Sequence, residues 1–217
     1  WDNDEGKNTG GMGSYSPHPW LDDSLVRNIM ARVAEPLIHG VREKYDMPYR
    51  GILYLGLMLV EEASGVVPYV LEINIRLGDP EAQVILPRLK SDLVDVSEAI
   101  LSGSLKDLTP VWDPRARVCL IAVSGVTKGK KGWYKGYPDR YKIGVPIQGL
   151  DSVDRECLVF HSGTGWGGEG ELITTGGRVL GIVSAGDNLS QAREIAYREM
   201  EKVSFEGLFY RRDIAKD

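Results

Sequence analysis

The chain has 217 residues, of which 42% are hydrophobic and 26% charged, and its formal net charge is −5. This length suffices for one large or two small domains, and the composition excludes disordered, collagen-like and coiled-coil chains. Its apolar runs are shorter than the roughly 20 residues of a membrane helix, and residues 1–5 are acidic where a signal peptide is basic. These features predict a cytoplasmic protein with no membrane partner, and the acidity argues against a general nucleic-acid binder.

The first residues and the two cysteines add two expectations. The chain opens on a polar stretch without an initiating Met, which predicts a piece of a longer polypeptide or a processed chain. Cys119 and Cys157 stand far apart in apolar stretches and without metal-ligand spacing. We therefore expect two free thiols that act as small hydrophobic side chains.

The first half predicts helices around a strand pair. Residues 1–20 are rich in Gly, Asn, Ser and Pro and predict a loop. An apolar stripe then predicts a helix, which Pro36 kinks or splits and which one of three residues caps: Asp22, Asp23 or Ser24. Residues 51–60 and 66–77 predict two antiparallel strands with the loop 61–65 between them. A second helix is expected from residue 79 to about 101, bent at Pro87.

Two prolines and a change in composition near residue 110 predict a domain boundary, with domains 1–110 and 111–217. In the second domain, apolar runs predict strands near 116–123, 156–161, 171–175 and 178–184, and then a helix over 189–203. Gly176 and Gly177 predict a two-residue hairpin loop with positive φ angles. The predicted fold class is α+β, an antiparallel sheet with covering helices followed by a smaller mixed sheet-plus-helix domain.

Three polar residues alternate along the strand predicted at 66–77. Glu72, Asn74 and Arg76 share one face, and apolar residues, Ile75 and Leu77 among them, fall on the other, which we expect to be buried. Carboxylate and amide oxygens suit Mg²⁺, and an arginine beside them can hold an anion. The polar outer face of a half-exposed strand explains the same pattern, so both interpretations stay open at this point.

Two loops have the composition of anion-binding segments. In residues 8–13, the glycines let the backbone approach a ligand closely, and small polar side chains supply hydrogen-bond donors. In residues 78–81, Asp79 and Glu81 stand at the start of a predicted helix, where free amides attract anions. An ordinary flexible glycine loop explains the first segment equally well.

Several long motifs resemble one enzyme family in collinear order. They span residues 4–17, 49–58, 71–83, 86–93, 159–164, 175–181 and 205–214. Together they closely resemble the phosphoribosylamine-glycine ligases, also called glycinamide ribonucleotide synthetases, which are ATP-grasp enzymes of purine biosynthesis. The resemblance implies a partial ATP-grasp domain that carries the metal-binding strand, followed by the C-terminal domain of the ligase.

The resemblance also implies an ATP-dependent carbon–nitrogen ligase with ATP, glycine and 5-phosphoribosylamine as substrates. It implies that Glu72 and Asn74 ligate Mg²⁺ or Mn²⁺, and that Asp4 and Arg76 are catalytic. The substrate-binding residues that it implies are Asn8, Thr9, Gly10, Gly11, Met12, Asp79 and Glu81. Glu5 and Lys7 depart from the family pattern and change the charge at the start of the first loop.

The family's N-terminal domain and small ATP-gripping lid have no counterpart in the motifs of this chain. We therefore expect the isolated chain to lack turnover and to expose apolar surface that the neighbouring lobe covers. Two alternatives stay open. The chain could be a natural half-chain subunit whose partner carries the missing domains, or part of an ATP-grasp ligase that acts on another acid and amine.

Two further patterns are weaker. Residues 163–168 have the spacing G-x-G-x-x-G, but a strand pattern follows where a dinucleotide site needs a helix, so we expect a hairpin loop. Basic residues interleave with aromatic ones between 127 and 142: Lys128, Lys130, Lys131, Lys135, Arg140 and Lys142. A glycine-rich surface loop is favoured over a nucleic-acid site there, because the whole chain is acidic.

Overall fold

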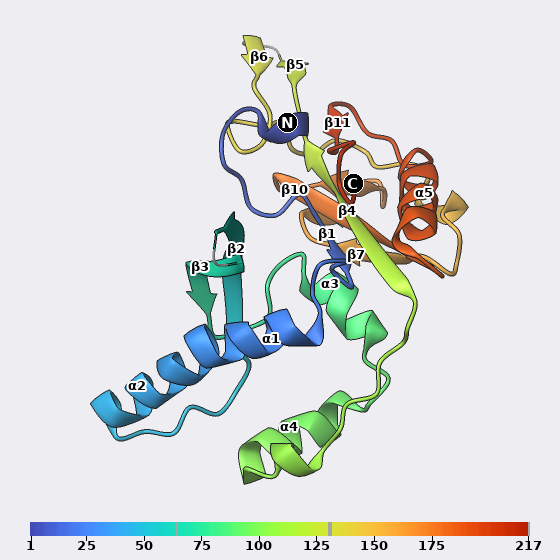
Figure 1. Ribbon diagram of the computed structural model, residues 1–217. Coiled ribbons are helices and arrows are strands. Elements are labelled where there is room, and N and C mark those ends of the chain that lie inside the picture. Colours follow the sequence, from blue (N-terminus) through green and yellow to red (C-terminus); the bar gives the residue numbers. More distant parts are fainter. Residues whose placement is uncertain (64, 130–131, 217) are drawn as a thin grey trace. The chain divides into compact units, whose positions relative to one another are not determined.

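The computed structural model describes residues 1–63, 65–129 and 132–216, and it divides the chain into two compact units. The first unit comprises Trp1–Pro17, Asp79–Arg88 and Asp113–Asp217, and the second comprises His18–Gly78 and Leu89–Trp112. Antiparallel sheets and helices build both units, which confirms the α+β class (Figure 1). The compact units interleave along the chain, and the domain boundary near residue 110 stays a prediction.

A five-stranded antiparallel sheet forms the centre of the first unit. Its strands are β1 (Gly13–Ser16), β4 (Ala116–Ser124), β7 (Leu158–His161), β10 (Arg178–Gly186) and β11 (Leu208–Phe209). The order is β1-β4-β10-β7, and β11 extends the edge that β1 forms on β4. All nine residues of β4 are buried, as expected for a strand covered on both faces.

The alternation of side chains along β4 feeds two hydrophobic clusters. Val118 and Leu120 pack with Ala192, Ala196 and Met200 of α5 (Leu189–Met200), which lies against β4 and β10. Cys119 and Ile121 belong to a second cluster with Val84 of α3 (Ala82–Ile85). Because successive strand residues point to opposite faces, the two helices cover the two sides of the sheet (Figure 1).

Most predicted elements of this unit are confirmed, but some expectations are wrong. Residues 13–16 form β1 instead of continuing the loop, because they pair with β4. Gly176 and Gly177 do not close a hairpin and have no positive φ. The strand before them, β9 (Leu172–Thr174), pairs with β8 (Thr164–Trp166), whereas β10 pairs with β4 and β7. The segment 163–168 belongs to this β8–β9 hairpin, but residues 164–166 form its first strand and not the predicted loop, which lies between Trp166 and Leu172.

The remaining elements of the first unit are short. A 3₁₀ turn covers Asp2–Asp4, and another covers Leu150–Ser152. The basic segment contains the hairpin of β5 (Thr127–Gly129) and β6 (Gly132–Tyr134), so it is partly a strand pair and not only a loop. Lys130 and Lys131 of the predicted basic patch lie outside the described residues.

The helices of the second unit begin at the predicted cap. The Asp22 carboxylate accepts a hydrogen bond from the Leu25 amide at 2.7 Å, and α1 (Asp23–Ile29) follows. A π-helical segment, Met30–Ala34, joins α1 to α2 (Glu35–Tyr45). The chain stays in the right-handed helical region at Ile29, Met30, Ala34 and Glu35, so the helix is not split. Its hydrogen-bond pattern changes just before Pro36, which cannot donate to the preceding turn.

The single helix expected over residues 79–101 is wrong. The chain forms the short α3, a 3₁₀ turn over Leu86–Arg88, and then the separate α4 (Leu93–Ser102). Pro87 interrupts the first helix, and Asp92 starts the next one by accepting a hydrogen bond from the Val94 amide at 2.8 Å. The first part belongs to the first unit and α4 to the second.

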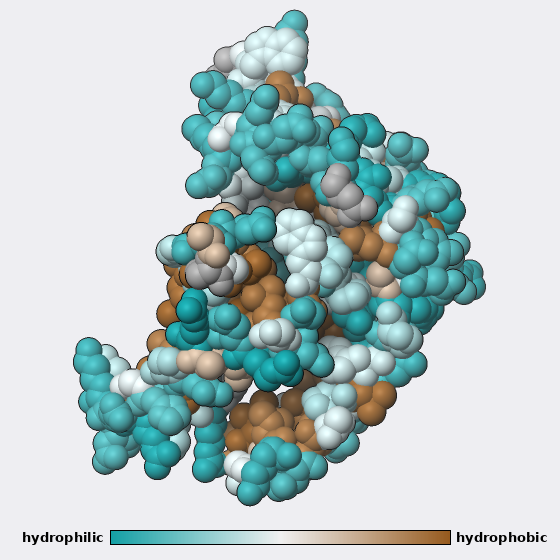
Figure 2. All heavy atoms as spheres, viewed as in Figure 1, coloured by the Kyte–Doolittle hydropathy of each residue, from teal (hydrophilic) through white to brown (hydrophobic). Residues whose placement is uncertain are grey.

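The hairpin of β2 (Tyr54–Glu62) and β3 (Gly65–Asn74) carries much exposed apolar surface. Leu71, Ile73 and Ile75, expected on a buried face, are exposed, Ile75 to 77%. A two-stranded sheet without a covering layer buries few side chains. Figure 2 shows apolar side chains at the surface over this hairpin and over α4, in agreement with the expected apolar exposure.

Two further expectations concern thiols and membranes. Cys119 and Cys157 are free thiols, and both are buried. Over the described residues, no helix has both the length and the apolar character needed to cross a lipid bilayer.

Candidate functional site

The strand β3 presents the predicted metal ligands on one face. Glu72 lies opposite Gly56 and Asn74 opposite Tyr54, in a regular register that places both side chains on the same side. A β-bulge at Leu71 shifts the register by one residue just before Glu72. A Cβ at Gly56 would lie 2.6 Å from Glu72 Cγ, so the glycine leaves the space that the Glu72 side chain uses. Glu72 is exposed and Asn74 half-buried.

Arg76 departs from the expected row of three side chains. The strand ends at Asn74, so Arg76 lies in the following bend and not on the strand face. Its guanidinium Nη1 donates to the Leu77 carbonyl oxygen at 2.7 Å, and the residue is exposed. The sequence pattern therefore placed Glu72 and Asn74 correctly on one face, but it extended the C-terminal end of the strand by three residues too many.

The glycine-rich loop at residues 8–12 lies in the first unit and lines a cavity of about 310 Å³. The remaining lining comes from the chain before the loop, from Gly13 directly after it and from the C-terminal tail. The lining residues are Trp1, Asp4, Glu5, Gly6, Lys7, Asn8, Thr9, Gly10, Gly11, Met12, Gly13, Arg211 and Ile214. The structure therefore brings Asp4 and all five predicted substrate-binding residues of the loop to one concave surface.

Arg178, at the start of β10, joins this loop to the segment that begins at Asp79. Its Nη1 donates to the carbonyl oxygens of Gly11 at 3.3 Å and of Asp79 at 3.1 Å. Its Nη2 forms an ion pair with Asp79 Oδ2 at 2.6 Å. Hydrogen bonds to a charged group are stronger than neutral ones, so this guanidinium fixes both segments.

Close backbone packing holds the same two segments together. A Cβ at Gly11 would lie 2.2 Å from Pro80 Cδ, so only glycine fits there. The Ser14 hydroxyl donates to the Pro80 carbonyl oxygen at 2.7 Å, and the Gly10 amide donates to the Tyr137 hydroxyl at 3.0 Å. These contacts anchor the loop to the Asp79 segment and to Tyr137.

Asp4 is part of an ion-pair cluster with the C-terminal tail. Arg211 Nη2 lies 2.9 Å from Asp4 Oδ1 and 2.6 Å from Asp213 Oδ2. Arg211 donates hydrogen bonds to the Asp213 carboxylate, and these bonds hold the pKa of Asp213 well below its usual range and raise the pKa of Arg211. The Asp4 side chain is itself 89% exposed, so one face of its carboxylate stays open to the cavity.

Asp79 and Glu81 stand at the beginning of α3. Asp79 Oδ1 accepts a hydrogen bond from Gln83 Nε2 at 2.9 Å, while its other oxygen pairs with Arg178. Glu81 is the half-buried residue before the helix, and its carbonyl oxygen accepts from the amides of Val84 and Ile85. Because α3 has only four residues, its amides form a much weaker anion site than the predicted long helix.

The structure thus divides the predicted site residues between the units. The loop, Asp4, Asp79 and Glu81 lie in the first unit, and Glu72, Asn74 and Arg76 lie in the second. Within the described part of the chain, no group of three or more His, Cys, Asp or Glu side chains could hold a metal ion. The sequence did not predict that Arg178, Tyr137 and Arg211 contact the loop and Asp4. Arg178 and Arg211 lie within the family motifs at 175–181 and 205–214, but no neighbouring residue in the sequence indicates which groups they contact.

Two family models match the chain. The ATP-grasp (A) domain of phosphoribosylglycinamide synthetase matches residues 1–82, and the C domain of the same enzyme matches residues 133–217. Together these matches cover well over half of the chain, in the order expected from the sequence motifs.

Individual relatives agree with the family models. The phosphoribosylamine–glycine ligase of Caldanaerobacter subterraneus subsp. tengcongensis is 47% identical over 99% of this chain and 48% of that protein. The one of Archaeoglobus fulgidus is 41% identical over 97% of this chain and 43% of that protein. The chain therefore spans about half the length of the curated relatives it matches.

Solved structures give the same result for the fold. The crystal structure of phosphoribosylamine–glycine ligase from Thermotoga maritima has a TM-score of 0.76 and 36% identity, and covers 98% of this chain and 48% of that one. A biotin carboxylase domain of Hydrogenobacter thermophilus 2-oxoglutarate carboxylase has a TM-score of 0.56 at 14% identity, over 91% of this chain and 40% of that one. The second likeness shows the fold alone.

Proposed function

Since this chain belongs to the phosphoribosylglycinamide synthetase family, we propose that it forms the C-terminal part of an ATP-dependent ligase that makes glycinamide ribonucleotide in the cytoplasm. The proposed enzyme joins glycine to 5-phosphoribosylamine and converts ATP to ADP and phosphate. The observation that carries the proposal is the collinear match of both family models at residues 1–82 and 133–217.

The proposed reaction has two steps. A carboxylate oxygen of glycine attacks the γ-phosphorus of ATP, the bond to ADP breaks, and glycyl phosphate forms. The amine nitrogen of phosphoribosylamine then attacks the acyl carbon, phosphate leaves, and the amine loses a proton. Both steps develop negative charge on phosphate oxygens, so cationic groups placed there accelerate the reaction.

The cavity beside residues 8–12 is the proposed substrate site. Asn8, Thr9, Gly10, Gly11 and Met12 would bind glycine and phosphoribosylamine through backbone and side-chain polar groups, together with Asp79 and Glu81. The contacts of Arg178 support this role, because they hold the loop and Asp79 in place before a substrate arrives. The exposed carboxylate of Asp4 would hold the amino group of a substrate.

Glu72 and Asn74 would hold Mg²⁺ or Mn²⁺. The donor set fits, because both residues carry hard oxygen atoms and share one strand face, and Mg²⁺ commonly keeps waters and substrate phosphates as its other ligands. The bound ion would neutralise charge on the phosphate oxygens of ATP. Arg76, exposed beyond the strand end, would hold an anionic phosphate or acyl phosphate group.

Release of ADP from ATP, glycine and freshly generated phosphoribosylamine tests the proposal. We expect none from this chain alone and steady release once a purified N-terminal half of a relative is added. Replacing glycine by other carboxylates in the mixture tests the alternative that another acid is the substrate. Steady, Mg²⁺-dependent product formation by the chain alone would contradict the expectation that it needs the other half.

One variant tests the metal ligand in the same mixture. Glu72→Gln removes a charged oxygen ligand and should reduce ADP release by more than about tenfold, because less charge on the phosphates is neutralised. Glu61→Gln, an exposed position on β2, removes the same charge outside the proposed site and serves as the control. Equal activities of the two variants would contradict a metal-binding role of Glu72.

A natural half-chain subunit is the second candidate. The chain spans about half the length of the relatives it matches, which fits a piece of one long ligase as well as a separate gene product that needs a partner with the remaining domains. Sequencing the gene upstream of the codon for Trp1 decides between them. A continuous reading frame that encodes the remaining domains supports a single long ligase, and a start codon close to Trp1 supports the subunit.

A further inference from the structure

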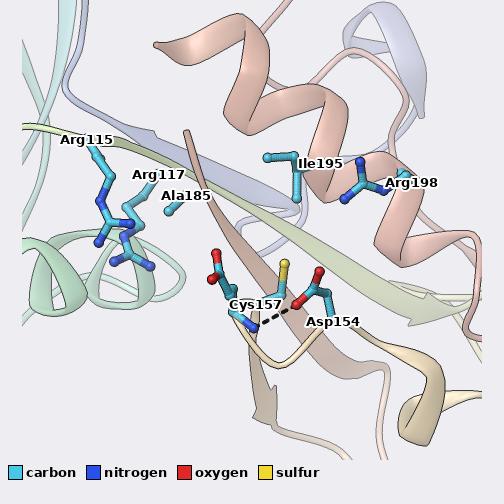
Figure 3. A pocket seen from close by; sticks show the side chains of 8 residues that line it. Arg115, Arg117, Asp154, Cys157, Ala185, Ile195 and Arg198 are labelled. Atoms are coloured by element: carbon cyan, nitrogen blue, oxygen red, sulfur yellow. Dashed lines mark hydrogen bonds between the residues drawn. The ribbon is translucent and has the colours of Figure 1, made fainter. Parts of the chain in front are cut away.

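A second cavity, of about 410 Å³, lies in the first unit, and the substrate loop takes no part in it. It is formed by the beginning of β4, the turn before β7, the end of β10 and one side of α5. Its lining residues are Arg115, Arg117, Asp154, Glu156, Cys157, Ala185, Ile195 and Arg198. Figure 3 shows Arg115 and Arg117 together on one side of this pocket and Arg198 on the other.

Arg117 is buried without enough hydrogen-bond partners. Only 9% of its side chain is exposed, and its Nε is buried and has no partner among the described residues. Its Nη2 lies 3.5 Å from the Pro87 carbonyl oxygen and 3.8 Å from Asp113 Oδ2, both long contacts. A buried guanidinium normally has its donors satisfied, so this group can still accommodate an acceptor.

Three arginines and two carboxylates, Asp154 and Glu156, line this pocket, and Arg115 and Arg88 are the cations that act on Arg117. Asp113 is the carboxylate next to it, but Arg115 binds Asp113 more closely, with Nη2 at 2.7 Å from Oδ2. Arg88 is also close, because its Nε donates a hydrogen bond to the main-chain carbonyl oxygen of Asp113 at 3.2 Å. Burial and then repulsion by Arg115 lower the pKa of Arg117, and the attraction of Asp113 only partly opposes this. A bound anion would reduce both the repulsion and the deficit of acceptors.

We propose that this pocket is a binding site for a phosphate group, which Arg117 and Arg115 would hold. Guanidinium groups donate to phosphate oxygens in pairs, and phosphate offers more acceptors than the single carboxylate of Asp113. Arg198 is already paired with Glu199 at 3.0 Å and adds positive charge at the other side. The exposed Glu156 in the pocket lining repels an anion. Removing its charge should therefore strengthen phosphate binding, whereas removing an arginine should weaken it.

The test is a titration of the chain itself with inorganic phosphate at constant ionic strength, with chloride as the reference anion. The signal is the NMR resonance of the Arg117 Nε–H group, assigned by its loss in Arg117→Met. We expect a saturable shift of this resonance with phosphate and none with chloride. A parallel titration with glycerol phosphate shows whether the site takes free phosphate or a phosphate monoester.

Calorimetry on variants gives the expected changes in affinity. Arg117→Met should weaken phosphate binding by about tenfold or more, and Arg115→Gln by several fold. Glu156→Gln should tighten it several fold, because a repelling charge is removed. Arg155→Gln removes one positive charge from the same turn at an exposed position outside the pocket lining, and its affinity should stay within about twofold.

These measurements do not use ligase activity. A failure of the phosphate-binding proposal is therefore distinguishable from a failure of the proposed function. If Arg117→Met fails to fold, Arg115→Gln, whose side chain is 49% exposed, and Glu156→Gln carry the test. Absence of saturable phosphate binding would overturn the proposal. Unchanged affinity in both Arg115→Gln and Glu156→Gln would overturn it as well.

Discussion

Replacing Arg178 by Met should loosen the glycine-rich loop at residues 8–12 without unfolding the first unit. The substitution keeps an apolar stem but removes the ion pair to Asp79 at 2.6 Å and the two hydrogen bonds to the carbonyl oxygens of Gly11 and Asp79. Hydrogen bonds to charged groups contribute about 1.5–3 kcal/mol. Because the side chains of Arg178 and Asp79 are 24% and 47% exposed, solvent screening reduces this to about 1–2 kcal/mol.

Hydrogen exchange of the amides in residues 8–13 measures this effect directly on the chain. A loss of about 1–2 kcal/mol corresponds to exchange about 5–30 times faster in this segment. Exchange in α5 should stay unchanged, because that helix contacts β4 and β10 through a separate cluster. Arg155→Met, which removes an exposed positive charge from the same unit, is the matched control.

Unchanged exchange of residues 8–13 in a folded Arg178→Met variant would refute this reasoning. The loop would then be held by its backbone packing against Pro80 and by the Tyr137 hydroxyl alone.

Two further predictions concern buried groups of the first unit. Burial raises the pKa of Glu199, but hydrogen bonds from Lys202, the Asp154 amide and Arg198 outweigh it and hold the pKa at about 2, against an ordinary 4.5. The carboxylate therefore stabilises the fold above pH 4.5 and loses this effect as pH falls toward 2. In urea unfolding, Glu199→Gln should lower the free energy of unfolding by about 3 kcal/mol at pH 7 but by only about 1 kcal/mol at pH 3. A difference between the two proteins that stays the same at both pH values would contradict the lowered pKa. Burial raises the pKa of Cys119 to about 12 and that of Cys157 to about 11. In a disulfide-exchange assay at pH 8, both thiols of the native protein should therefore react at least about a hundredfold more slowly than after unfolding. Rapid reaction of either native thiol would contradict this.

The elements that the sequence predicted well are those whose signal is local. The helix cap at Asp22, the irregular helical turn before Pro36 and the buried strand β4 all follow from residues within a few positions of one another. The shared face of Glu72 and Asn74 is likewise a consequence of strand alternation.

The errors come from partners that are distant in sequence. Gly176 and Gly177 suggested a hairpin, but β10 pairs with β4, more than fifty positions earlier in the chain, while β9 pairs with the nearby β8. Residues 13–16 look like a loop until β4 supplies a pairing edge more than a hundred positions later. The same limit applies to the site, because Arg178 is separated by 167 positions from Gly11 and by 99 from Asp79.

Incorporation of isotope-labelled glycine tests the central claim most directly, that this chain supplies the substrate loop and metal ligands of a glycine ligase. The assay contains this chain, an N-terminal half of a relative, ATP, Mg²⁺ and phosphoribosylamine, and it measures label in a phosphate-bearing product. We expect label to appear at the same rate as ADP and only when both halves and all three substrates are present. Release of ADP without incorporation of glycine, or equal incorporation of another amino acid, would contradict it.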